Sequence, residues 1–207
     1  MYLPDHFAAP STIDIHDAMT SATIGELVTF DGAALVGSTL PWVLDHDRGE
    51  YGTLRGHVAR ANPQWQTAVA HIDALAIFHG PDAYVSPSMY PSKPRHGRVV
   101  PTWNYVTVHA SGSLVVHDDA AWVERLVRDL TSVHESTRTE PWSVDDAPRS
   151  YIDAMLGQIV GVEIPITRLT GKWKLSQNRP TEDHDGVATE LAAGSQGDQA
   201  VAGLMTR

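Results

Sequence analysis

The alternation of apolar and polar residues along the chain predicts a protein built mostly of β-strands. Val99–Ala110 alternates between two faces, with the period of a strand that has two different sides. Ala74–Gly80 is a continuous apolar run, typical of a strand buried on both faces, and Val160–Leu169 forms a further expected strand. Asp31 and Gly32 separate two further apolar runs and predict a hairpin with a type I′ turn. Such segments give about eight strands, joined as in an antiparallel barrel.

Helical patterns occur between these strands and after them. Their apolar residues recur at the spacing of one helix face, and capping residues precede several of them. The segments expected to be helical are residues 12–22, the stretch after Asp118 and Asp119 that carries Trp122, Leu126 and Leu130, Pro148–Gln158, and two short helices after Pro180. Tyr90–Gly97 contains two prolines and a glycine, and it predicts a loop. The expected fold class is therefore mainly β with peripheral helices.

Composition narrows the classes of function. The chain has 207 residues, of which 42% are hydrophobic, enough for one substantial core. Its formal net charge of −10 argues against non-specific binding of nucleic acid, although DNA contact at a local site stays possible in principle. Since there is no cysteine, disulfides, thiolate metal sites and cysteine nucleophiles are excluded. Neither a signal peptide nor a membrane-length apolar run is evident, so we expect a cytoplasmic protein.

Three polar-aromatic stretches at the margins of strands are the strongest indication of a binding site. They are Gly56–Pro63, Val100–Tyr105 and Lys174–Arg179. Together they offer cations for an anion, amides for the edge of a heteroaromatic ring, and aromatic faces for stacking. Each also has a purely structural interpretation: Arg60 as a surface cation, Asn104 as an amide satisfied within the protein, and the third stretch as a solvated strand end.

Familiar catalytic and metal-binding motifs are missing from the sequence. No GxSxG, GxGxxG, P-loop or HExxH pattern occurs. Eleven histidines are present, but most are isolated along the chain, among them His16, His46 and His134. We therefore expect no dedicated metal site, and we assign no catalytic acid or base.

Several sequence segments resemble the PaiB family, a group of FMN-binding split-barrel proteins that are named negative transcriptional regulators. The resemblance is specific in combination and extends from the first residue to about residue 179. The matching segments are Met1–Phe7, Thr39–Pro41, Gly52–Trp65, Tyr84–Lys93, Val100–Tyr105 and Lys172–Arg179.

This resemblance implies an FMN-binding split β-barrel of the pyridoxamine-phosphate-oxidase-like type, and a homodimer with flavin at each end of its interface. We expect residues 1–180 to form the flavin-binding barrel with inserted helices, and residues 181–207 to form a helical tail. Arg60 and Lys93 would meet the phosphate, and Trp103 or Tyr105 would form an apolar wall. The full set of expected cofactor-binding residues is His57, Arg60, Asn62, Lys93, Thr102, Trp103, Asn104, Tyr105, Lys174, Gln177 and Asn178.

Three functions are compatible with this resemblance. The first is a flavin-binding protein with redox activity, in which FMN carries the chemistry. The second is a regulator that binds DNA or a partner protein, for which a basic face would be needed. The third is a haem-binding or haem-handling split-barrel protein, with His57 or His109 as the axial ligand.

Overall fold

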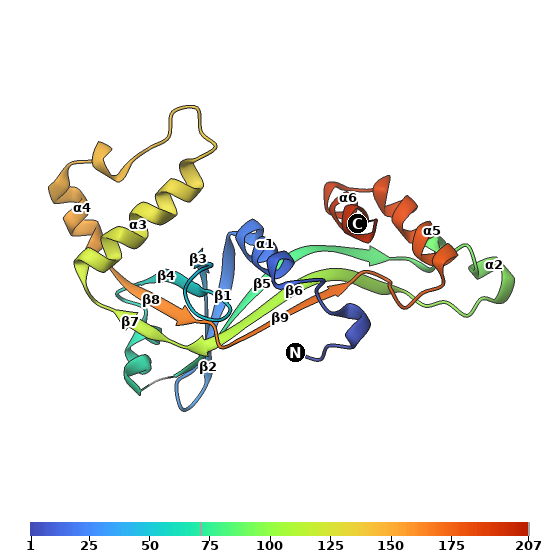
Figure 1. The fold of residues 1–207 in the computed structure, drawn as a ribbon, viewed down its shortest axis with the longest axis horizontal. Helices are drawn as coiled ribbons and strands as arrows, with labels where there is room; N and C mark the ends of the chain where they lie inside the picture. The colour runs from blue at the N-terminus through green and yellow to red at the C-terminus, as the bar shows by residue number, and fades with distance from the viewer. Residues whose placement is uncertain (71, 207) are drawn as a thin grey trace. The chain divides into compact units, whose positions relative to one another are not determined.

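The computed structural model describes residues 1–70 and 72–206, and Figure 1 shows how its strands and helices are arranged. The strands form a five-stranded sheet in the order β2-β1-β5-β6-β9 and a four-stranded sheet in the order β3-β4-β8-β7. The strands are β1 Ile24–Phe30, β2 Leu35–Pro41, β3 Val43–Asp45, β4 Thr53–Ala59, β5 Asp73–Val85, β6 Thr102–Ser113, β7 Val115–His117, β8 Ile159–Pro165 and β9 Arg168–Lys174.

Helices connect and flank the strands. The α-helices are α1 Thr12–Ala22, α2 Lys93–His96, α3 Ala120–Glu135, α4 Arg149–Leu156, α5 Thr181–Ala192 and α6 Gln196–Met205. Short 3₁₀ turns occur at η1 Asp5–Phe7, η2 Pro63–Ala70, η3 Pro87–Met89 and η4 Val144–Asp146. Among the described residues, no helix combines the length and the apolar character needed to cross a membrane.

The chain divides into two compact units. Unit 1 consists of Met1–Ile15, His79–Val108 and Thr170–Arg207, of which Arg207 lies outside the described residues. Unit 2 consists of His16–Phe78 and His109–Leu169. The long strands β5 and β6 pass from one unit into the other, so the two units share continuous strands.

Unit 2 packs helix α3 against the four-stranded sheet. Strand β4 pairs antiparallel with β3 and β8, and β8 pairs with β7. Asp119 caps α3 by accepting a hydrogen bond from the Trp122 amide, as the sequence predicts. The side chain of Trp122 lies where a Cβ on Gly161 of β8 would be, so this glycine is what lets helix and sheet approach closely.

Unit 1 packs helices α5 and α6 beside the ends of the long strands. Val187 and Leu191 of α5 and Val201 of α6 are buried. The buried Asp183 of α5 accepts hydrogen bonds from the amide and the hydroxyl of Ser92, at 3.0 and 2.7 Å. These bonds hold the segment that follows β5 against α5.

Several local expectations are corrected by the structure. The β1–β2 hairpin has a four-residue loop instead of a type I′ turn. The Asp31 carboxylate holds this loop by accepting hydrogen bonds from the backbone amides of Ala33 and Ala34. The expected loop at residues 90–97 contains the short helix α2. β6 runs on through Gly112, past the expected strand end at Ala110, and at Gly112 the backbone of Pro165 leaves no room for a side chain.

Candidate functional site

Lys172, Lys174 and Arg179 bring three cationic side chains together in unit 1; we call them the cation group. Lys172 and Lys174 are two residues apart on β9, so they project to the same face of the strand. The Lys172 Nζ donates to the backbone oxygen of Tyr2 at 3.2 Å. The Lys174 Nζ donates to the Thr102 hydroxyl at 2.7 Å and to the backbone oxygen of Trp103.

Aromatic rings surround the cation group. The Lys172 Nζ lies 5.5 Å from the ring centre of Tyr105, 5.7 Å from that of Tyr2 and 5.9 Å from that of Phe7. These distances fall in the range of cation–π contacts. The Arg179 guanidinium lies 5.0 Å above the ring of Tyr90, whose buried hydroxyl has no hydrogen-bond partner among the described residues.

The electrostatics of the cation group favour a bound anion. Burial lowers the pKa of Lys174, and the positive charges of Lys172 and Arg179 lower it further. Within the described part of the chain, no carboxylate forms an ion pair with any of these three side chains. Like charges repel one another more strongly when they are partly buried. A bound anion would offset this repulsion, which no carboxylate of the described residues offsets.

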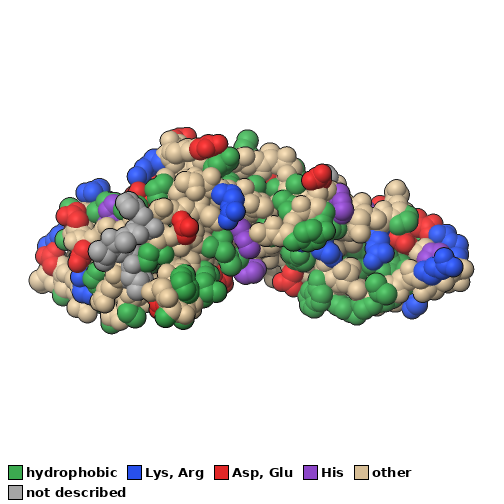
Figure 2. Space-filling view, turned by 90° about the horizontal axis from the view of Figure 1, so that it is seen from below, with side chains coloured by type: hydrophobic (Ala, Val, Ile, Leu, Met, Phe, Trp, Pro, Cys, Tyr) green, Lys and Arg blue, Asp and Glu red, His purple; other side chains and the backbone are tan. Residues whose placement is uncertain are grey.

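A groove of about 490 Å³ lies in unit 1, and Tyr105, which lines it, also contacts Lys172 of the cation group. Trp103 and Tyr105 line it from β6, and His79 and Asp82 line it from β5. Trp103 is 52% exposed and contacts the ring of Tyr84 edge to face. Figure 2 shows hydrophobic side chains beside lysine and arginine side chains over the elements of unit 1, at the right of the view. Aromatic walls beside a cationic group suit a planar ring system that carries an acidic group.

The first predicted stretch belongs to unit 2. Arg60 is engaged there by Asp118, and it also donates to the backbone oxygens of Gly157 and Ile159. Asn62 donates to Ser38 and accepts from the amide of residue 64, as in a local turn. The guanidinium and this amide are therefore used within the protein.

His57 also belongs to unit 2 and lies on β4. It lines a groove of about 300 Å³ together with Leu130 and Trp142, and burial lowers its pKa.

The second and third predicted stretches meet in unit 1. Asn104 is fully buried, accepts from the Ser176 hydroxyl at 3.0 Å, and donates to the sulfur of Met205. It points away from the face of Trp103 and Tyr105, since neighbours on a strand alternate.

Three further predicted residues lie near the ends of elements in unit 1. Gln177 bonds locally to the amide of Leu175 and the backbone oxygen of Trp173. Lys93 begins α2 with an exposed side chain, and Asn178 is exposed after β9.

Sequence reasoning missed the central role of Lys172 and of the chain's beginning. Lys172 was within a matching segment but not among the expected site residues. Its spacing from Lys174, two positions on a strand, is the signal that would have placed both on one face. Nothing local to Tyr2 or Phe7 indicates that they contact β9, because their contacts depend on the fold.

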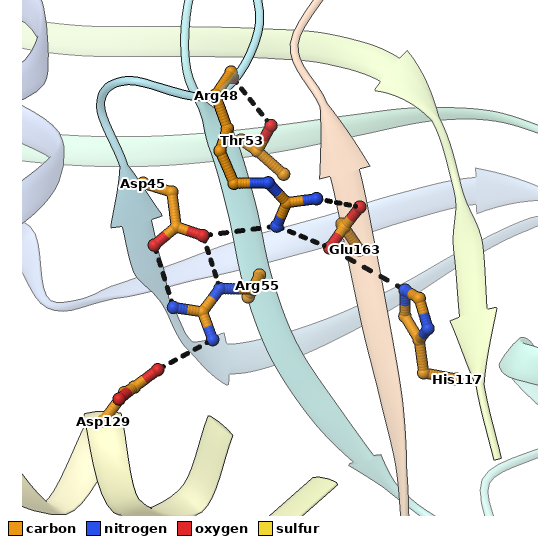
Figure 3. A network of polar contacts seen from close by, with 7 residues as sticks. All are labelled: Asp45, Arg48, Thr53, Arg55, His117, Asp129 and Glu163. Carbon is orange, nitrogen blue, oxygen red and sulfur yellow. Dashed lines mark hydrogen bonds and ion pairs between the residues drawn. The ribbon is translucent and has the colours of Figure 1, made fainter. Parts of the chain in front are cut away.

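A separate polar network lies in unit 2, and Figure 3 shows its members. Arg48 donates to both oxygens of the buried Glu163 carboxylate, at 3.0 and 3.1 Å. The His117 Nε2 lies 3.7 Å from the same carboxylate, and burial lowers the pKa of His117. Arg55 joins Asp45 and Asp129, at 2.7 and 2.9 Å. Every carboxylate drawn has an arginine partner. The ion pairs therefore tie the strands of this sheet to one another and to helix α3.

Comparison with known proteins identifies the family. A domain family described as "Putative FMN-binding domain" matches residues 1–168. The Bacillus subtilis protein named "Protease synthase and sporulation protein PAI 2" is 31% identical, over 92% of this chain and 89% of its own length. The chain belongs to the PaiB family. Another relative, an uncharacterized protein of Aspergillus fumigatus, is 36% identical over 74% of each chain.

Two solved structures share the fold of this PaiB-family chain. The flavocytochrome Anf3 of Azotobacter vinelandii is 10% identical with a TM-score of 0.60, covering 86% of this chain and 75% of that protein. The FAD- and haem-binding protein of Mycobacterium smegmatis is 14% identical with a TM-score of 0.60, covering 90% and 80%. The predicted fold class, a mainly β split barrel with peripheral helices, is confirmed. The family match ends at residue 168, the first residue of β9, so Lys172, Lys174 and Arg179 lie outside the matched residues.

Proposed function

We propose that this protein binds FMN, with the phosphate at the cation group and the ring system in the neighbouring groove. The observation that carries the proposal is the set of three partly buried cations that no carboxylate pairs with in the described part of the chain. The family's description as an FMN-binding domain supports the same cofactor.

The residues present fit such a ligand. A phosphate dianion would interact with Lys172 and Lys174 by charge-assisted hydrogen bonds, and it would relieve their mutual repulsion. Arg179 adds a further positive charge close enough to lower the pKa of Lys174. Trp103 and Tyr105 would form the aromatic wall, and the groove volume suits a three-ring system.

Bound FMN would supply hydride or single-electron transfer, and the protein would supply position and electrostatics. The part assigned to this chain is to bind and orient the cofactor. A redox reaction and a role in transcription stay predictions that come with the family.

We also infer that a second copy of the chain covers the aromatic face of unit 1. Trp103 and Tyr84 touch one another and are 52% and 47% exposed, while Tyr2 is 82% exposed and Val100 63% exposed. Exposed aromatic side chains in contact with one another, as Trp103 and Tyr84 are, are typical of protein interfaces. Light scattering is expected to report a dimer, and a monomer at micromolar concentration would contradict this inference.

The test of FMN binding compares two ligands and three variants. Lys174→Met should weaken FMN about tenfold to a hundredfold, because a hydrogen bond to a charged group contributes about 1.5–3 kcal/mol. Riboflavin, which lacks the phosphate, should lose much less. Lys93→Met is a matched control, since Lys93 is exposed on α2. Affinities would be measured by quenching of flavin fluorescence, with circular dichroism to check the fold.

Other outcomes would point elsewhere. A phosphate-selective loss in Lys93→Met or Arg60→Met, but not in Lys174→Met, would move the phosphate to those side chains. Equal losses of both ligands in Lys174→Met would remove the phosphate from the cation group. A Soret band in the purified protein, without flavin bands, would favour the haem alternative, for which His57 offers a partly buried imidazole with a lowered pKa.

A further inference from the structure

His16 and His46, isolated from each other in the sequence, form a close pair in unit 2. His16 lies on α1, and His46 follows β3 in the turn that leads to β4. Their Nδ1 atoms are 3.2 Å apart, with ring centres 5.0 Å apart and planes inclined by 63°. His46 is exposed and His16 is half-buried, so solvent and ions can reach the pair.

The hydrogen bonds fix how the protons are distributed when both rings are neutral. The His16 Nε2 lies 3.0 Å from the backbone oxygen of Tyr51, and a carbonyl oxygen can only accept. His16 therefore carries its proton on Nε2, and its Nδ1 presents a lone pair. The proton between the two rings then belongs to the Nδ1 of His46.

We propose that this pair binds one divalent ion of the late first-row transition metals, such as Zn²⁺. Imidazole nitrogens bind Zn²⁺ at about 2.0–2.1 Å, so two nitrogens 3.2 Å apart can share an ion at an N–metal–N angle of roughly 100°, close to tetrahedral. Metal-binding histidines usually donate their other ring N–H to a carbonyl or carboxylate, and His16 already does so to Tyr51.

Besides the contact of His16 with Tyr51, other side chains hold the turn that carries His46. Asp45 is bound by Arg55 through two hydrogen bonds, at 2.7 and 2.8 Å. Thr53 donates to the backbone oxygen of Arg48 at 2.8 Å, which closes the turn. Two ligands on separately anchored elements are thus presented together, which reduces the ordering needed for binding.

No group of three metal-binding side chains occurs within the described residues, so water would occupy the remaining positions. We therefore expect affinity in the micromolar range, with selectivity for ions that favour imidazole. Mg²⁺ prefers oxygen ligands and should not compete. The bound ion would join α1 to the β3–β4 turn and should raise the melting temperature, since it binds the folded state.

The test is calorimetric titration of Zn²⁺ into the full-length, metal-free protein. One ion per chain is expected. His16→Ala and His46→Ala should each weaken binding at least tenfold, and the double variant should be little worse, because one imidazole alone cannot chelate. His134→Ala is the matched control, since His134 is an exposed histidine on α3. Binding that His134→Ala weakens as much as His16→Ala would overturn the proposal, as would no binding.

Nitrogen NMR of the histidine rings gives a second readout that does not depend on affinity. Without metal, the His46 Nδ1 should show the signal of a protonated nitrogen. With Zn²⁺, the Nδ1 atoms of both rings should show metal coordination, and the proton of His46 should move to Nε2. Coordination through Nε2 of either ring would contradict the assigned site. Failure of this test leaves FMN binding untouched, because flavin binding is assigned to residues of unit 1.

Discussion

We expect Arg48→Met to destabilise the protein far more than the loss of an exposed ion pair would. Arg48 donates to both oxygens of Glu163. The Glu163 side chain is only 8% exposed, whereas the Arg48 side chain is 52% exposed. Removing the arginine therefore leaves a buried carboxylate without its main partner, while the vacated space stays open to water.

These exposures set the expected magnitude. Removing one partner of a fully buried ion pair costs about 3–5 kcal/mol, and an exposed pair contributes about 0–1 kcal/mol. Because only one partner is buried in the Arg48–Glu163 pair, water can partly solvate the carboxylate that is left. We expect a loss of about 1.5–3 kcal/mol in the free energy of unfolding, the range for hydrogen bonds to charged groups.

Urea denaturation measures this loss against a matched control. Arg95 and Glu182 form a similar pair, but their side chains are 62% and 43% exposed, so Arg95→Met should destabilise the protein much less than Arg48→Met. Replacing Glu163 by glutamine in the Arg48→Met background should recover part of the stability, because the buried charge is gone. Equal losses in the two arginine variants would refute the argument from burial.

The same variant has a spectroscopic signature at His117. The positive charge of Arg48 lowers the pKa of His117, whereas the negative charge of Glu163 raises it. Arg48→Met should therefore raise the pKa of His117, as followed by NMR titration. An unchanged pKa would mean that the two side chains do not interact as the geometry indicates.

Two further predictions concern pH and backbone packing. Burial lowers the pKa of His57 and His117, so the unfolded chain binds more protons. Stability from this source is complete above the unfolded pKa of about 6.5 and is lost as the pH falls toward the folded pKa. The urea concentration at the unfolding midpoint should therefore decrease as the pH is lowered below about 6.5. The decrease should be smaller in His57→Gln than in the unchanged protein. Gly112→Ala would place a Cβ against the backbone of Pro165 and should cost about 1–3 kcal/mol by thermal denaturation. Gly37→Ala, which meets no atom within 4 Å, should cost far less.

Local patterns were sufficient to predict most elements of the fold. The cap at Asp119 and the apolar face of α3 are encoded within one stretch, as are α1 and the two helices after Pro180. Short-range rules failed where distant backbone decides the conformation. Strand β5 continues through Gly80 and Pro81, because its partner β6 is long enough to support it.

The site was predicted less completely than the fold. The stretches around Trp103 and Lys174 do meet in unit 1, and both contribute to the cation group and groove. The sequence could not show that Asn104 faces the other side, toward Met205, or that Asp118 engages Arg60. Such pairings join residues tens of positions apart, so they depend on strand register and not on local composition.

The interleaving of the two units has a consequence for how this protein can be divided. Unit 1 is built from three stretches of chain and unit 2 from two, so the chain passes between them four times. No uninterrupted piece of the gene encodes a whole unit, and neither unit could be transferred to another protein by a simple fusion. A protease that cuts the chain once would leave two fragments, at least one of them with segments from both units. We expect these fragments to stay associated after cleavage and to separate only in denaturant.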